Sequence, residues 1–176
     1  MVAMQIKAIG DDVLRPGIGE TPARVVKSWK ELYSGYNENP ADHLRKRFPI
    51  EGSQMVTLND IEFFSMCEHH MLPFFGRADV TYIANEQACG LSKLARVVEA
   101  YARRMQMQEN LTKQIADLIE SELNPLGVAV RVRGVHMCMR ARGVRSSSAE
   151  MTTTQLRGAF LDNDSARSEW LANLPK

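Results

Sequence analysis

Hydrophobic residues follow two different periods along this sequence, one typical of helices and one of strands. From residue 92 they recur every three or four positions, at Leu94, Val97, Val98, Tyr101, Ala102 and Met105. That spacing places them on one face of an amphipathic helix. The same spacing continues over residues 110–123 and stops at Asn124-Pro125. We therefore predict two consecutive helices, each burying one face.

A shorter helix is predicted near the N-terminus. Thr21 is a suitable N-cap, and Pro22 suits the first helical position. Hydrophobic residues at helical spacing follow, at Val25, Val26, Trp29 and Leu32. Residues 1–20 are weakly patterned and predict a loop, whereas residues 36–57, with Asn-Pro and mixed charge, predict an irregular connection.

Alternation with a period of two predicts strands. Val128, Val130 and Val132 alternate with less hydrophobic residues, which is typical of a strand with one buried face. Further strands are predicted over residues 61–66, 77–84 and 151–160, with a turn near Pro73 and Gly76. We also interpret residues 135–142 as a strand, which would place on one face His136, Cys138, Arg140 and Arg142.

These elements predict an α+β fold. Antiparallel strands form a sheet, the two consecutive helices pack on one face of it, and the N-terminal helix is added. The tail from Asp164 is predicted to form a short helix packed by Trp170 and Leu171. The length of 176 residues fits a single domain over residues 1–176.

Composition narrows the class of protein. The net charge is +1, so no overall field favours binding to nucleic acid or to a membrane, and we expect neither partner. No run approaches the roughly 18 apolar residues of a membrane span, and the N-terminus lacks the pattern of a signal peptide. Three cysteines are a poor disulfide framework, which favours a cytoplasmic location.

A cluster of cysteine and histidine predicts a zinc site. Cys67 and His70 are three residues apart, and Cys138 follows about 70 residues later. Thiolate and imidazole together suit Zn²⁺. Three protein ligands would leave the fourth coordination position open, as in a catalytic zinc site. Zinc lowers the pKa of a water bound at that position to about 7. His69 and His136 would then be free to move protons.

Other interpretations of the cluster stay open. The cysteines could be small core residues, and a structural zinc site could recruit a fourth ligand among His69, His136 and Cys89. Cys89 has no partner nearby in the sequence, so we expect it in the core.

Several residues suit a phosphorylated purine. Ser92-Lys93 opens a predicted helix and Arg96 lies one turn on, which favours an anion site. Arg142 belongs to an arginine-rich segment that could be a solvated strand face, although beside zinc a phosphate explains it better. Glu109 follows Gln108 between the two helices and could accept two N–H groups of guanine, or could be a surface glutamate.

Four segments resemble the GTP cyclohydrolase I family. They are Cys67-Glu-His-His70, Gly90-Leu-Ser-Lys-Leu-Ala-Arg96, Gln108-Glu-Asn-Leu-Thr112 and His136-Met-Cys-Met-Arg-Ala-Arg-Gly143. The resemblance extends from about Glu20 to Phe160. It implies a tunnelling-fold (T-fold) subunit in a ring-like homodecamer with active sites at subunit interfaces. It also implies conversion of GTP to 7,8-dihydroneopterin triphosphate and formate, with the imidazole ring opened at C8.

The resemblance implies a role for each candidate residue. The zinc ligands would be Cys67, His70 and Cys138. Proton transfer would fall to His69 and to His136, which would lie near N7 of the base. Glu109 would anchor the guanine with help from Gln108, and Ser92 would contact the ribose region. The triphosphate would be held by Lys93, Arg96 and Arg142, with Arg24 from a neighbouring subunit. The resemblance assigns no role to Arg140, Arg145 or Arg157.

Two further hypotheses remain. The first keeps the fold but makes Cys67 or Cys138 the nucleophile of a pterin or deazapurine enzyme; the predicted metal triad argues against it. The second is a zinc-stabilised module that holds nucleotides or nucleic acid on its arginines without turnover.

Overall fold

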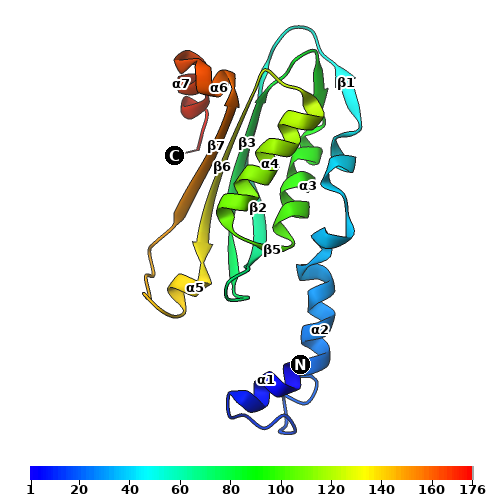
Figure 1. The fold of residues 1–176 in the computed structure, drawn as a ribbon, viewed down its shortest axis with the longest axis vertical. Coiled ribbons are helices and arrows are strands. Elements are labelled where there is room, and N and C mark those ends of the chain that lie inside the picture. The colour runs from blue at the N-terminus through cyan, green and yellow to red at the C-terminus, as the bar shows by residue number, and fades with distance from the viewer. Residues whose placement is uncertain (176) are drawn as a thin grey trace.

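A computed structural model describes residues 1–175, and its main feature is a five-stranded sheet covered on one face by two helices (Figure 1). The strand order is β5-β2-β3-β6-β7, and β2, β3, β6 and β7 pair antiparallel. Their bounds are Met55–Cys67 for β2, Pro73–Ile83 for β3, Met105–Gln106 for β5, Gly127–His136 for β6 and Met151–Gly158 for β7. The predicted α+β class, with an antiparallel sheet and two consecutive helices, is confirmed.

Helices α3 (Leu91–Ala102) and α4 (Gln108–Leu123) supply a large share of the core. Their buried side chains pack with those of β3 and β6, and include Leu94, Val97, Val98, Leu111, Ile115 and Ile119. Both predicted helices are confirmed. The first ends three residues before Met105, because the chain pairs Met105 and Gln106 with the end of β2 as a short parallel strand.

The N-terminal region contains more helix than the sequence predicted. Residues Val2–Ala8 form α1, where a loop was expected, and the buried Val2 and Ile6 share one face four residues apart. Helix α2 spans Thr21–Leu32, but its N-cap is Glu20 instead of Thr21. Both helices extend from the lower end of the subunit in Figure 1, and none of the residues of α2 is buried.

The connection over residues 36–57 is more regular than predicted. It includes most of the 3₁₀ helix Ser34–Asn37, the 3₁₀ helix Pro40–Leu44, strand β1 (Arg47–Pro49), which pairs with β4 (Gln87–Cys89), and the start of β2. The turn expected near Pro73 and Gly76 lies earlier, and both residues belong to β3. Gly76 is needed there because a Cβ would lie 1.9 Å from the carbonyl oxygen of Arg133 on β6.

The prediction of a strand over residues 135–142 was wrong. Strand β6 ends at His136, and Met137–Arg140 form a helical turn, α5. The register gives the reason: β7 begins at Met151 opposite Gly134, and His136 is the last residue of β6 that pairs with β3. Beyond it the backbone has no strand to bond, so Ala141 donates to the carbonyl of Met137 at 2.8 Å.

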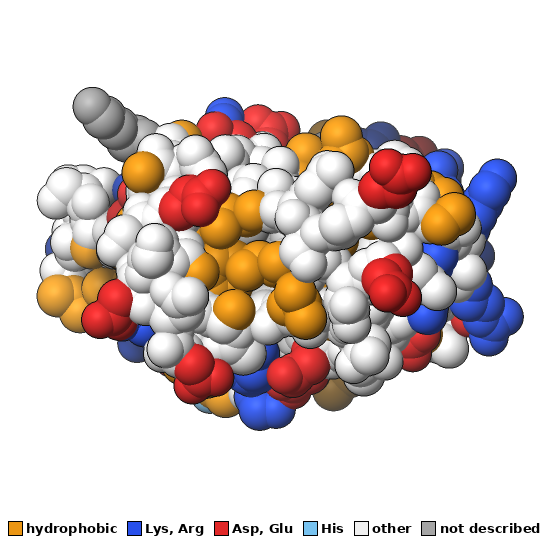
Figure 2. Space-filling view, turned by 90° about the horizontal axis from the view of Figure 1, so that it is seen from above, with side chains coloured by type: hydrophobic (Ala, Val, Ile, Leu, Met, Phe, Trp, Pro, Cys, Tyr) orange, Lys and Arg blue, Asp and Glu red, His pale blue; other side chains and the backbone are white. Residues whose placement is uncertain are grey.

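The C-terminal segment caps the upper end of the sheet. Strand β7 ends at Gly158, earlier than residue 160, and Ala159–Asp162 (α6) and Asp164–Ala172 (α7) follow. Trp170 is buried as expected and packs against Phe160, but Leu171 is exposed. Seen from above, this end shows hydrophobic side chains in the middle with acidic side chains around them (Figure 2). Within the described residues, no helix has the length and hydrophobicity to cross a membrane.

Candidate metal centre and active site

Three segments that lie far apart in the sequence meet at the lower end of the sheet. Cys67 is the last residue of β2, His70 lies in the turn before β3, and Cys138 lies in α5 after β6. Their ligand atoms all lie within 4.8 Å of one another. The turn is closed by two backbone bonds of 2.8 Å, from the amide of Cys67 to the carbonyl of Leu72 and from the amide of Met71 to the carbonyl of Cys67.

The donor set fits a tetrahedral divalent metal. The Sγ of Cys67 lies 3.7 Å from Nδ1 of His70, close to the edge of about 3.6 Å expected between sulfur and nitrogen ligands of zinc. Burial, and then the neighbouring Cys67, raises the pKa of the Cys138 thiol. A divalent cation would supply the opposite charge that stabilises both thiolates. Cys67, His70 and Cys138 can therefore hold a metal.

The two other histidines flank this cluster in contrasting surroundings. His69 is exposed on the turn, with its Nδ1 4.0 Å from the Sγ of Cys67. His136 is partly buried and its ring lies parallel to Phe74, with centroids 4.7 Å apart and planes at 4°. Burial lowers the pKa of His136, and the charge of Glu109 opposes that shift.

Gln108 is buried beside His136 at the start of α4. Its Oε1 lies 2.9 Å from Nε2 of His136, and its Nε2 lies 3.0 Å from the carbonyl oxygens of both Val132 and Met151. Glu109, the next residue, is exposed. The order Gln108-Glu109 thus places an amide in the interior and a carboxylate at the surface of the same site.

The candidate phosphate ligands are divided between the two ends of the subunit. Arg142 is exposed on the loop after α5, close enough to Cys138 for its charge to oppose, in small part, the rise in the pKa of that thiol. Ser92, Lys93 and Arg96 lie at the upper end of α3 (Figure 1). Ten residues of helix separate Ser92 from the lower end of α3, a rise of about 15 Å.

Four other arginines form ion pairs within the subunit. Arg131 and Arg133 bind Asp79 and Asp60 at 2.8 and 2.9 Å, on the sheet. Arg157 joins β7 to Asp117 of α4 at 2.9 Å. Arg24 is exposed on α2 and pairs with a glutamate one turn earlier on its own helix.

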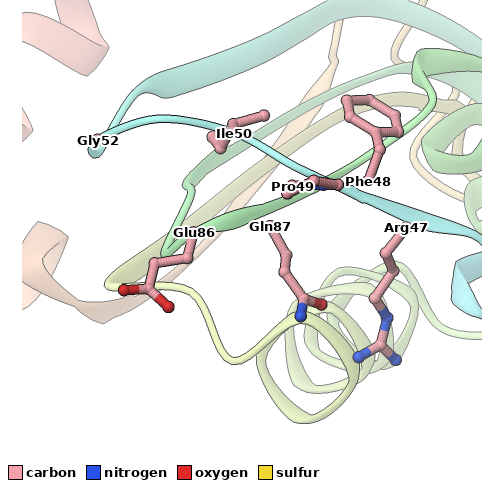
Figure 3. A pocket seen from close by; sticks show the side chains of 7 residues that line it. All are labelled: Arg47, Phe48, Pro49, Ile50, Gly52, Glu86 and Gln87. Carbon is pink, nitrogen blue, oxygen red and sulfur yellow. The ribbon is translucent and has the colours of Figure 1, made fainter.

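A surface pocket of about 500 Å³ lies away from the metal ligands, between β1 and β4 (Figure 3). Its lining residues are Arg47, Phe48, Pro49, Ile50, Gly52, Glu86 and Gln87. Arg47 points towards α4, where it binds Glu122 at 3.1 Å. No residue of this lining belongs to the predicted site, so this pocket and the metal cluster are separate features.

The sequence did not reveal Phe74, which stacks on the ring of His136, or Gly134, where a side chain would collide with the amide of Gln108. Phe74 was expected near a turn, and Gly134 was not singled out. Phe74 and His136 are 62 positions apart and become neighbours through the pairing of β3 with β6. No local pattern marks such a pair, because the contact depends on the register of two strands.

Comparisons with known proteins identify the family of this chain. The family model for GTP cyclohydrolase I matches residues 1–174. The GTP cyclohydrolase 1 of Desulforamulus reducens is 51% identical over 176 residues, covering 99% of this chain and 94% of that one. The GTP cyclohydrolase 1 of Deinococcus radiodurans is 47% identical over 168 residues, covering 95% and 78%.

A solved structure is more distantly similar. The apo form of an archaeosine synthase QueF-Like matches with a TM-score of 0.48 at 19% identity, covering 59% of this chain and 93% of that one. The family model and the curated relatives both span nearly the whole chain, and the expected metal ligands converge in space. This chain therefore belongs to the GTP cyclohydrolase I family.

Proposed function

We propose that this chain catalyses the zinc-dependent conversion of GTP to 7,8-dihydroneopterin triphosphate with release of formate. The observation that carries the proposal is the meeting of Cys67, His70 and Cys138 beside His136, in a member of this family. Bound by these three ligands, zinc would keep one open position and supply a Lewis acid that lowers the pKa of water towards about 7.

The histidines are proposed to move the protons of the reaction. Burial lowers the pKa of His136 and so favours its neutral ring, which can take a proton from the attacking water. It then passes the proton to a ring nitrogen of the base as the C8–N9 bond opens. A second hydrolysis releases C8 as formate. His69, which is exposed, would exchange protons between the site and solvent.

The remaining candidate residues are proposed to bind and orient GTP. The carboxylate of Glu109 would accept two N–H groups of the guanine edge. Ser92 would contact the ribose while it opens and the pterin ring closes. The triphosphate would be held by Lys93, Arg96 and Arg142, with Arg24. These contacts orient C8 without themselves accelerating the chemical step.

We propose that each active site is completed by a neighbouring subunit, in a ring-like homodecamer. Within one subunit Ser92 and Lys93 lie at the far end of α3 from the metal ligands. Helix α2 buries no residue although one of its faces is hydrophobic, and exposed hydrophobic side chains on or near α1 and α2 include Met4, Ile9, Leu14, Val26 and Tyr36. Surfaces of this kind favour association between subunits.

We propose a cytoplasmic location because the predicted metal site needs reduced cysteines. All three cysteines are free of disulfide bonds, and Cys67 and Cys138 must stay reduced to bind a metal. A reducing compartment keeps such thiols available. The assignment of residues 1–176 to one domain stays a prediction.

The proposal is tested by incubating the zinc-loaded chain with GTP. We expect a pterin product, fluorescent after oxidation, and one formate for each GTP consumed. ATP is the matched control because it has the same triphosphate but lacks the guanine edge that Glu109 would bind, and we expect no product from it. Removal of zinc with a chelator should stop turnover, and addition of zinc should restore it.

Two outcomes would contradict the proposal. Binding of zinc and GTP without any pterin would identify a nucleotide-binding module instead of an enzyme. Full turnover in metal-free protein would exclude the zinc mechanism and would return attention to Cys67 or Cys138 as a nucleophile.

A further inference from the structure

The side-chain amide of Gln108 can take one orientation. The residue is 1% exposed, and its Nε2 lies 3.0 Å from two backbone carbonyl oxygens, those of Val132 and Met151. Carbonyl oxygens accept hydrogen bonds and cannot donate them. If the amide were rotated by 180°, its own oxygen would face both carbonyls in the interior, which is strongly unfavourable. The amide nitrogen therefore faces the sheet and Oε1 faces away from it.

That orientation of the amide determines which ring nitrogen of His136 carries the hydrogen. The Oε1 of Gln108 lies 2.9 Å from Nε2 of His136, and an amide oxygen can only accept. Nε2 of His136 must therefore donate the hydrogen. In a neutral imidazole one nitrogen donates and the other accepts, so the lone pair of the ring lies on Nδ1.

The surroundings of the pair hold both side chains in place. The ring of His136 stacks on Phe74, which is fully buried. The hydroxyl of Thr112 donates to the backbone carbonyl of Gln108 at 2.7 Å, one turn along α4. A Cβ on Gly134 would lie 2.4 Å from Oε1 of Gln108, so a glycine at this position leaves the space that the amide occupies.

We propose that Gln108 is a positioning residue that holds Nε2–H of His136 and leaves Nδ1 as the nitrogen that exchanges a proton with the substrate. This inference rests on the proposed function of His136 in proton transfer. It differs from the role implied by the family resemblance, in which the side chain of Gln108 helps to bind guanine. Both ends of the buried amide are already bonded within the subunit, which leaves it no free group for a ligand.

The first test compares Gln108→Met with Gln106→Met. Each variant replaces a buried glutamine amide by an apolar side chain of similar length, but the amide of Gln106 bonds the carbonyl of Tyr101 and the side chain of Gln114, away from His136. We expect Gln108→Met to lower kcat about 10²-fold, the effect of misplacing a reacting group by about 1 Å, with KM for GTP changed less than about threefold. Gln106→Met should leave kcat within about threefold of the parent.

A second variant covers the case in which Gln108→Met does not fold. Gly134→Ala keeps every polar group and displaces Oε1, so it should lower kcat with the same small change in KM. A rise in KM with unchanged kcat in either variant would overturn the proposal, since it would show that Gln108 binds substrate. Equal losses of kcat in Gln106→Met and Gln108→Met would also overturn it, as a merely structural effect.

The second test observes the ring directly. Histidine-selective ¹⁵N spectra of the zinc-loaded protein, at about pH 8 where an ordinary histidine is neutral, should show His136 with a protonated Nε2 and a bare Nδ1. The resonance is assigned by its absence in His136→Ala. A hydrogen on Nδ1 in the parent would overturn the proposal. This measurement does not require turnover, so it tests the inference even if the chain fails to convert GTP.

Discussion

The two ends of the subunit each contain cysteine, and the contrast shows what distinguishes a candidate metal centre from a core thiol. At the lower end, Cys67 and Cys138 come from different segments and lie together with His70. Near the upper end, Cys89 is 3% exposed within the hydrophobic core, where its backbone amide donates to the hydroxyl of Tyr82 at 3.2 Å. No second thiol accompanies it among the described residues. Residue type alone therefore does not make a ligand; convergence does.

Replacing one cysteine at each end of the subunit should give the largest difference in activity between two variants. Cys138→Ala removes one of three proposed ligands and should lower turnover of GTP by more than about 10⁴-fold, beyond what general acid–base catalysis alone contributes. Cys89→Ala should keep its zinc and most of its activity. Metal content per chain and the rate of pterin formation provide the readout. Comparable loss of zinc in both variants would remove the distinction between the two ends.

A histidine pair tests whether the lower end is specialised for proton transfer. His136→Ala should lower kcat by about 10²- to 10⁴-fold while zinc stays bound, because a general acid–base is lost. His43 lies in the 3₁₀ helix Pro40–Leu44, with its Nε2 2.9 Å from a carboxylate oxygen of Glu38, and is not part of the cluster, so it serves as the control. His43→Ala should turn over GTP at nearly the parent rate. An unchanged kcat in His136→Ala would exclude the assigned role.

The upper end of α3 offers a test of the shared site. Lys93→Ala should raise KM for GTP, because one charge on the triphosphate is lost. If a neighbour supplies Lys93 to the site that contains Cys138, mixed assemblies of Lys93→Ala and Cys138→Ala subunits should regain activity in up to about a quarter of their sites. The rate at low GTP, after dissociating and reassembling the mixture, measures this. No gain over the separate variants would place both residues in the same subunit's site.

The smallest expected effect is a change in folding stability on replacing Tyr82, which bonds the backbone of Cys89 in the core. Burial raises the pKa of Tyr82 to about 12, above its value in the unfolded chain, so the folded state retains the proton longer. Folding stability from this group is therefore complete below about pH 10 and is lost as pH rises towards about 12. Tyr82→Phe should show a flatter dependence over this window and cost about 1 kcal/mol near neutral pH through the lost hydrogen bond. Denaturant unfolding at several pH values measures both.

Local patterns predicted the elements that have a long, regular period. The run from Leu94 to Ala102 and the run from Leu111 to Leu123 form helices with the expected faces inward, and the alternating valines form the buried β6. The segment after His136 shows the limit of such patterns. Its alternation resembles a strand, yet it turns into α5 because neither neighbouring strand extends far enough to pair with it.

The sequence by itself determined which metal-binding groups this protein offers. Cys67, His70 and Cys138 predicted a metal site because thiolate and imidazole suit zinc. The tertiary structure brought their ligand atoms within 4.8 Å of one another. Only the tertiary structure decided how the site is supported. The pairing of β3 with β6 brings Phe74 onto His136, and the start of α4 brings Gln108 to its Nε2. Contacts of this kind depend on strand register and helix placement, which no short stretch of sequence specifies.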